Sequence, residues 1–150
     1  MMKKNILVIS LIFFLVNCGF TPIYLKNTDI NFSIEQVNYT GDKELNNFLK
    51  TNLDQYKNKK IDNKIYIQAD SIYKKIVLSK DGAGEVTNYQ LEAEVIFLIK
   101  PLNKTIKITE KKIMDSMDDK FEEARKERTI KQSFASSISN KLSSEISVNQ

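Results

Sequence analysis

Residues 85–100 (EVTNYQLEAEVIFLIK) carry the clearest two-residue alternation in the chain, and this stretch constrains the fold most strongly. Every second side chain is apolar: Tyr89, Leu91, Ala93, Val95, Phe97 and Ile99. The positions between them begin polar and end apolar: Gln90, Glu92, Glu94, Ile96 and Leu98. A strand with this pattern buries one face and leaves most of the other in water. The stretch therefore predicts a sheet that is covered on one side only.

Three further stretches predict strands, over residues 28–39, 64–80 and 105–114. In the first, the apolar side chains change parity after Ile34, so either a bulge near Glu35 and Gln36 restores the same face or the buried side switches. In the last, Ile106 and Ile108 are expected inside.

The strand predicted over residues 64–80 also changes parity along its length. Its first half buries Ile65, Ile67 and Ala69, whereas Ile72, Ile76 and Leu78 have the opposite parity. We therefore expect a bulge or bend near Asp70 and Ser71. The glycine-rich residues 81–84 (DGAG) then predict a hairpin turn into the strand over residues 85–100, because glycine supplies positive φ angles.

Two amphipathic helices are predicted. The first follows Asp42, a good N-cap, and its apolar stripe consists of Leu45, Phe48, Leu49, Leu53 and Tyr56. The second is expected from about residue 117 to 146, opened by a capping box of Ser116 and Asp119. Its stripe consists of Phe121, Ala124, Ile130, Phe134, Ile138 and Leu142. The i,i+4 pairs Glu122/Lys126 and Glu127/Lys131 are expected on its wet side.

The element order is therefore β-α-β-β-β-α. It predicts an α+β fold: a two-layer sandwich with a four-stranded, mostly antiparallel sheet and two helices packed on one face. Residues 28–150 are expected to form a single domain.

The N-terminal stretch predicts an exported protein. Lys3 and Lys4 precede a run of eleven residues, 6–16, that is apolar except for one serine; this is too short to span a bilayer but fits a signal peptide. Residues 15–18 (LVNC) resemble the lipobox of bacterial lipoproteins, although Asn17 stands where Gly, Ala or Ser is usual. We therefore expect a signal peptide over residues 1–17, a diacylglycerol and an N-acyl group on Cys18, and an acylated tether over residues 18–27. The alternative is a signal anchor with an incidental cysteine.

Composition excludes several kinds of chemistry. Histidine is absent and Cys18 is the only cysteine, so the chain has no imidazole base, no imidazole ligand and no internal disulfide. Without residues 1–17, 21 basic residues face 19 acidic ones, a balance of +2 that gives no sign of nucleic-acid binding. A metal site at Asp115, Asp118 and Asp119 is less plausible than helix capping. We expect no enzymatic activity, no metal and no cofactor apart from the lipid on Cys18.

Basic residues gather at the start of the second helix: Arg125, Lys126, Arg128 and Lys131. Because glutamates are interleaved with them, a solvated helix face is the plainer interpretation. The alternative is a contact for an anionic partner such as a phosphorylated lipid, which arginine can grip through two donors. Lys74, Lys75 and Lys80 could extend such a basic surface.

Residues 18–24 (CGFTPIY) resemble the mature N-terminus of the alphaproteobacterial LptE lipoproteins of lipopolysaccharide assembly. The element order, the hairpin leading into Tyr89, and the Glu/Arg-rich start of the last helix are also similar to that family. The resemblance implies an outer-membrane lipoprotein that plugs and helps to assemble the LptD β-barrel, sits in its lumen and binds lipopolysaccharide. It implies Lys80, Arg125 and Lys126 as lipopolysaccharide contacts, and Gly19 after the cysteine favours the outer membrane. The alternative is a generic envelope lipoprotein that acts as a binding or scaffold module for another outer-membrane complex.

Overall fold

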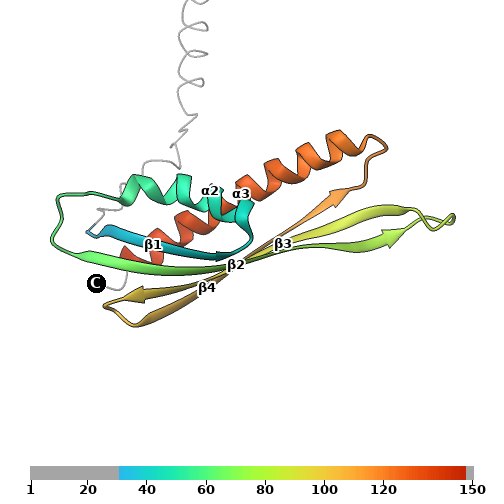
Figure 1. Ribbon diagram of the computed structural model, residues 1–150. Coiled ribbons are helices and arrows are strands. Elements are labelled where there is room, and N and C mark those ends of the chain that lie inside the picture. The colour runs from blue at the N-terminus through green and yellow to red at the C-terminus, as the bar shows by residue number, and fades with distance from the viewer. Residues whose placement is uncertain (1–30, 148–150) are drawn as a thin grey trace, which may run out of the picture.

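The computed structural model describes residues 31–147, and in them two helices lie on one face of a four-stranded sheet (Figure 1). The elements in chain order are β1 (Ser33–Gly41), α2 (Lys43–Leu53), the 3-10 turn η1 (Asp54–Tyr56), β2 (Lys64–Lys80), β3 (Val86–Lys100), β4 (Lys104–Asp115) and α3 (Lys120–Ser147). The predicted α+β class and the order β-α-β-β-β-α are confirmed.

The sheet has the strand order β1-β2-β3-β4. β2, β3 and β4 form an antiparallel meander, whereas β1 pairs with β2 in parallel. Parallel neighbours need a crossover connection, and α2 with η1 provides it. The sheet is therefore mostly antiparallel, as expected.

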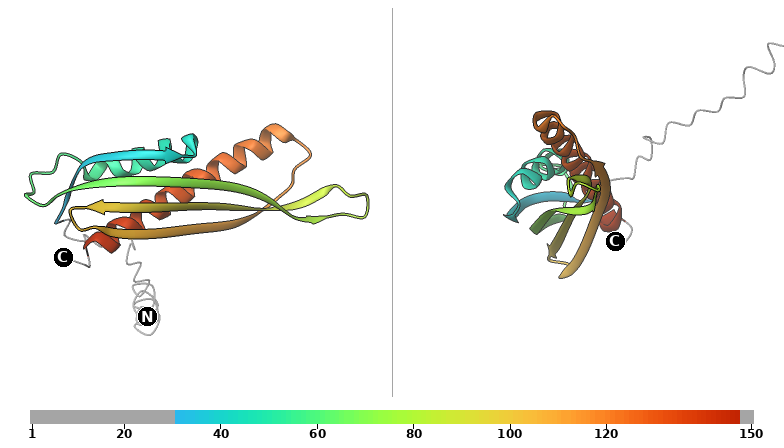
Figure 2. Two further views of the ribbon diagram at one scale, coloured as in Figure 1. Left: turned by 60° about the horizontal axis from the view of Figure 1, so that its bottom comes forward. Right: turned by 90° about the vertical axis from the view of Figure 1, so that its right-hand side faces the viewer.

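The two helices lie on one face of the sheet (Figure 2). The core lies between them and the sheet, and its centre is the inward face of β3, whose five inward side chains from Leu91 to Ile99 have no solvent exposure. Facing them are Leu45 and Leu49 of α2 and Ile138 and Leu142 of α3, all equally buried. The opposite face of the sheet carries no helix in the described part of the chain. The alternation of residues 85–100 thus predicted correctly which face is covered.

Local signals at the end of β1 are confirmed. The register with β2 shifts between Ile34 and Gln36, so the predicted bulge exists and keeps Val37 and Tyr39 packed against the core. Asp42 caps α2, because its Oδ1 accepts the Leu45 amide at 2.7 Å. Between them, Gly41 has φ +92°, and a Cβ there would lie 1.8 Å from the Ser71 carbonyl oxygen.

The bulge predicted near Asp70 and Ser71 is wrong. The register between β2 and β3 runs without a shift from Tyr66 to Val77, and the irregularity comes only between Val77 and Lys80. Ile72, Ile76 and Leu78 are therefore exposed instead of buried: their exposed fractions are 43%, 39% and 48%. The polar side chains of Tyr73 and Lys75 turn toward α3 in their place, because α3 offers them carboxylate partners.

The start of α3 also differs from the prediction. The helix begins at Lys120, and Asp119 is its cap, since its Oδ1 accepts the Phe121 amide at 2.8 Å. Phe121 is 76% exposed and Ala124 is exposed, so neither belongs to the buried stripe.

The expected pairs on the wet side of α3 are absent from residues 31–147. Glu127 and Lys131 point toward the rest of the protein and bind Lys75 and Glu44, while Glu122 pairs with Arg125.

The predicted signal peptide over residues 1–17, the tether over residues 18–27 and the lipid-bearing Cys18 lie outside the described residues. Within residues 31–147, neither helix combines the length and the apolar character that crossing a bilayer requires.

Candidate functional site

The β2–β3 hairpin extends well past the end of β1, and its far part forms a separate arm (Figure 1). We call residues 72–94, in which β2 and β3 pair from Ile72↔Glu94 to Lys80↔Val86, the distal arm. The first turns of α3 lie over its helix-facing side. All three predicted lipopolysaccharide-binding residues lie at this end of the molecule, so it is the candidate site.

Lys80 is exposed at the tip of the distal arm, directly before the turn. The turn is held by Asp81, whose Oδ1 accepts the amides of Ala83 at 2.9 Å and Glu85 at 2.8 Å. Gly84 has φ +88°, which glycine adopts without strain. The predicted hairpin turn is confirmed, and its rigid loop places one cation at the tip.

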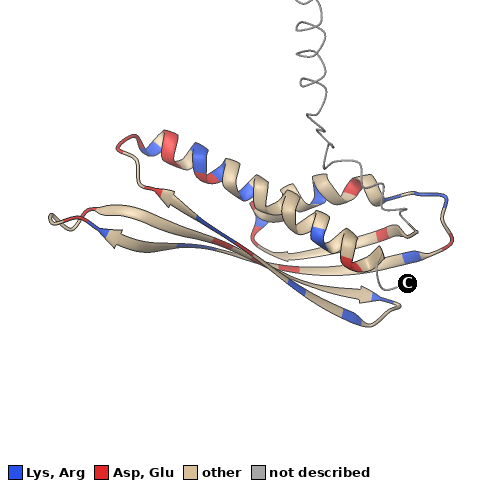
Figure 3. Ribbon diagram, turned by 180° about the vertical axis from the view of Figure 1, so that it is seen from behind, with Lys and Arg blue, Asp and Glu red and all other residues tan. Residues whose placement is uncertain are grey.

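Arg125 and Lys126 lie on α3, one turn beyond its start. Arg125 is exposed and its Nη1 lies 3.6 Å from the Glu122 carboxylate, a weak surface pair. Lys126 is half-buried and has no ion pair within residues 31–147. No contact joins either residue to Lys80 in the described part of the chain, so these three cations share one end of the molecule without forming a cluster. Charges of both signs alternate along α3 (Figure 3).

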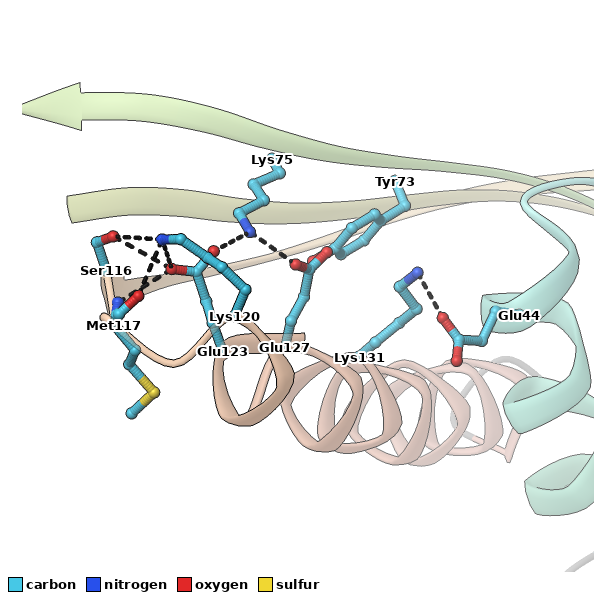
Figure 4. A network of polar contacts seen from close by, with 9 residues as sticks. All are labelled: Glu44, Tyr73, Lys75, Ser116, Met117, Lys120, Glu123, Glu127 and Lys131. Carbon is cyan, nitrogen blue, oxygen red and sulfur yellow. Dashed lines mark hydrogen bonds and ion pairs between the residues drawn. The ribbon is translucent and has the colours of Figure 1, made fainter. Parts of the chain in front are cut away.

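Glu123 is the centre of a polar network between α3 and the distal arm (Figure 4). Only 5% of the residue is exposed. Its Oε1 accepts a hydrogen bond from the Lys75 ammonium at 2.9 Å. Its Oε2 accepts bonds from the Met117 amide at 3.0 Å, the Ser116 hydroxyl at 3.1 Å and the Lys120 ammonium at 3.2 Å. One buried carboxylate thus joins β2, the β4–α3 loop and α3.

Lys75 connects this carboxylate to a second one. Its ammonium also donates to Glu127 at 2.9 Å and lies 4.1 Å from the centre of the Tyr89 ring. Glu127 in turn accepts the Tyr73 hydroxyl at 2.9 Å. The hypothesis that Lys75 extends a basic surface is therefore wrong, since its charge is neutralised between the layers.

The network continues toward α2 through Lys131. This lysine is 7% exposed; its ammonium binds Glu44 at 2.8 Å and lies 4.0 Å from the centre of the Tyr73 ring. Where the sheet extends past α2, these polar pairs thus lie beside the buried apolar side chains of Leu91 and Met114. The sequence did carry a signal for this network: Tyr73 and Lys75 continue the inward alternation of Ile65, Ile67 and Ala69. The predicted bulge would have turned them outward, so the signal was missed.

The charges in the network perturb one another. The hydrogen bond from the Met117 amide, and then that from Lys75, lower the pKa of Glu123 to about 2. Burial opposes the charged form of Lys75, but the hydrogen bonds to Glu123 and Glu127 outweigh it and raise the lysine pKa. Burial, and then the bond to Glu127, raise the pKa of Tyr73. These shifts favour the charged forms of Glu123 and Lys75 and the neutral form of the Tyr73 phenol, which suits a structural brace better than a proton-transfer site.

The open face of the sheet is polar in its middle. Lys107 pairs with Glu94 at 2.9 Å, and Lys111 pairs with Glu92 at 3.1 Å. These exposed ladders hold β3 and β4 together at little net energy and keep the face wet.

A cavity of about 700 Å³ opens beside the hairpin tip. Acidic residues at its wall include Asp81, Glu85 and Asp118, and Lys120 lies among them. No group of three or more acidic or thiol side chains within residues 31–147 has the geometry to hold a metal ion.

Three solved structures share the fold. The crystal structure of rare lipoprotein B from Shewanella oneidensis matches with a TM-score of 0.55 at 16% identity, over 77% of this chain and 100% of that one. The solution structure of an uncharacterized lipoprotein B from Nitrosomonas europaea gives a TM-score of 0.55 at 18% identity, over 79% and 86% of the two chains. A minor lipoprotein from Acinetobacter baumannii gives 0.55 at 12% identity, over 77% and 92%.

At these identities the likeness is one of fold. No protein-family model matches the chain, and no curated protein sequence matches it. The lipoprotein fold that residues 18–24 implied by resemblance to LptE is confirmed.

Proposed function

We propose that the chain is an outer-membrane lipoprotein of the LptE type, which plugs and helps to assemble an LptD-like β-barrel and assists the insertion of lipopolysaccharide into the outer leaflet. The observation that carries the proposal is the fold: it covers the whole length of a protein described as rare lipoprotein B. Such a role is non-enzymatic, and it agrees with a chain that lacks histidine.

The N-terminus supports the same role. Residues 15–18 resemble a lipobox, and residues 18–24 resemble the mature start of LptE proteins. Acylation at Cys18 with two or three chains gives stable membrane anchoring, since each buried methylene contributes about 0.8 kcal/mol. A lipid-anchored domain with no other cofactor is thus the form in which we expect the protein to act.

The surface of the domain suits a barrel interior. The lumen of a large outer-membrane barrel is polar, so a plug must present polar side chains to it. The open sheet face does so through the Glu92–Lys111 and Glu94–Lys107 ladders. The rigid two-layer body gives the plug a fixed shape.

Lipopolysaccharide binding is assigned to the distal end. Lys80 at the hairpin tip, and Arg125 and Lys126 on α3, present cations at one end of the molecule and have no strong ion-pair partner among residues 31–147. Phosphate groups attract such cations, and arginine can bind a phosphate with two donors.

Affinity purification from native membranes tests the proposal. The tagged, lipidated protein should recover a large outer-membrane β-barrel in a stable complex after mild detergent extraction. Recovery of the lipoprotein free of any barrel would refute the plug role. Recovery with a different outer-membrane assembly would instead favour a scaffold module.

A further inference from the structure

The outer edge of β2 is covered by β1 along only part of its length. The parallel pairing ends at Gly41↔Ser71, where the chain turns at φ +92° and leaves the sheet into α2 (Figure 1). The Asp42 amide donates to the Ser71 carbonyl at 3.1 Å, and among residues 31–147 no backbone bond follows it on that side of β2. From Ile72 onward, β2 is an edge strand.

Residues 72–77 form a regular stretch of this edge. They pair with β3 from Ile72↔Glu94 to Val77↔Tyr89 without a shift, and pair with no other strand among residues 31–147. Six residues of strand extend about 20 Å. Along them, alternate backbone N–H and C=O groups point outward and lack a strand partner in the described chain.

The side chains of residues 72–77 are of the kinds found in strands that are paired along both edges. Ile72, Ile76 and Val77 are 43%, 39% and 46% exposed, the isoleucines on the open face and the valine on the helix-facing side. Proteins usually protect free edges with proline, bulges or outward charges. Here the bulge comes only after Val77, there is no proline, and Lys75 is bound between two glutamates. Lys74 is the single outward charge.

We infer that residues 72–77 bind an extended segment of a partner protein. The segment adds to β2 as a fifth strand, on the same edge as β1 and beyond the end of β1. The segment carries apolar side chains and an acidic residue that faces Lys74. Lys74 has no ion pair within residues 31–147, because Glu92, directly opposite it on β3, pairs with Lys111 instead. The inference rests on the proposed function only for the identity of the partner, which would be the barrel protein.

Two other occupants fit less well. A second copy that paired antiparallel about Lys74 would place the partner's Lys74 directly opposite it, and like charges directly opposite destabilise a sheet. A lipid would cover the isoleucines but could not satisfy the outward N–H groups. An extended acidic segment satisfies both the backbone and the charge.

Site-specific photocrosslinking tests the inference. Ile76 is replaced by p-benzoylphenylalanine in the full-length lipidated protein in its native membranes, and Ile113 is the matched control. Both residues lie on the open face in one row, Ile76↔Gln90↔Ile113, but Ile113 lies on β4 at the opposite edge of the sheet, two strands or about 10 Å from β2.

We expect a peptide adduct at Ile76 with a yield at least ten-fold above that at Ile113, and mass spectrometry identifies the peptide. Equal labelling at both positions, a lipid adduct, an adduct of the chain with itself, or no adduct at Ile76 would each overturn the inference.

A charge reversal provides the second readout. Lys74→Glu should lower the yield at Ile76 about ten-fold, whereas Lys112→Glu, an exposed lysine on the opposite edge strand, should leave it unchanged. Equal crosslinking yields in the two variants would contradict the presence of an acidic partner residue that faces Lys74.

The outcome for the proposed function is separate. A crosslinked peptide from a protein other than the barrel would support the strand addition but show that the barrel is not the partner. Recovery of the barrel without an adduct at Ile76 overturns the strand addition and leaves the proposed function in place.

Discussion

Replacing Glu123 by glutamine tests whether the polar network helps to hold α3 against the distal arm. The change keeps the shape of the side chain but removes its charge. One of its two terminal atoms becomes a donor, so it can no longer accept from both Lys75 and the Met117 amide. Within residues 31–147, Lys75 then keeps Glu127 as its one carboxylate partner.

The magnitude follows from the contacts that are lost. A hydrogen bond to a charged group contributes about 1.5–3 kcal/mol, and the Lys75–Glu123 bond at 2.9 Å is of this kind. The Lys120 side chain is 69% exposed, so its pair with Glu123 adds little. We expect the free energy of unfolding to fall by about 2 kcal/mol, or about thirty-fold in the folding equilibrium.

Urea denaturation of the mature protein in detergent, followed by circular dichroism, measures this difference at pH 7. Glu122→Gln is the matched control, since Glu122 is one residue away, 52% exposed and only 3.6 Å from Arg125. It should change the free energy of unfolding by less than about 0.5 kcal/mol. Equal losses in the two variants, or a loss below 0.5 kcal/mol in Glu123→Gln, would refute the role of the network.

The lowered pKa of Glu123 predicts that the difference in unfolding free energy between wild type and Glu123→Gln depends on pH. The pKa of Glu123 is lowered in the folded state to about 2, so its stabilising effect is complete above the ordinary carboxyl pKa and is lost as pH falls toward 2. The difference between wild type and Glu123→Gln should stay constant from pH 7 to about 5 and shrink below about 4.5. A difference that grows on acidification would contradict the assignment.

Three further changes have definite expected outcomes. Gly41→Ala should destabilise the domain by at least about 3 kcal/mol, because the new Cβ meets the Ser71 carbonyl at φ +92°, whereas Gly82→Ala, with no atom within 4 Å, should stay within about 0.5 kcal/mol; thermal unfolding compares them. Lys80→Asp should weaken lipopolysaccharide binding in a pull-down while barrel recovery is unchanged, and unaltered binding would remove Lys80 from the site. Cys18→Ser should abolish metabolic labelling with radioactive palmitate, and retained label would place the acyl chains elsewhere.

Much of the fold was predictable because its signals are local. The ends of β2 coincide with the predicted residues 64–80, since a polar loop and a glycine turn bound it. Asp42 was recognisable as a cap from its position before an apolar stripe, and the inward face of β3 from a single alternation. Each of these features depends on neighbours within a few residues.

The distal arm was not predictable in the same way, because the side chains on either face of β2 could be the buried ones. Ile72 and Ile76 favour one face for burial, and Tyr73 and Lys75 occupy the other. The outcome is decided by Glu123, which lies 48 residues from Lys75 in the chain. Only the packing of α3 over the arm brings that carboxylate to the lysine, and no periodicity encodes this.

The predicted start of α3 was wrong for a related reason. Ser116 and Asp119 are both good caps by residue type. In the fold, the Ser116 hydroxyl donates to Glu123, so Asp119 alone accepts the free helix amides. The site residues Lys80, Arg125 and Lys126 remain predictions, since their proposed partner is a lipid and not a part of this chain.

Depletion of the protein in its own cells tests the proposed function most directly. Surface lipopolysaccharide is measured by labelling intact cells as the protein is removed. The account predicts that newly made lipopolysaccharide fails to reach the outer leaflet and accumulates inside the cell envelope. An unchanged rate of surface arrival, with depletion verified by immunoblot, would contradict a role in lipopolysaccharide insertion.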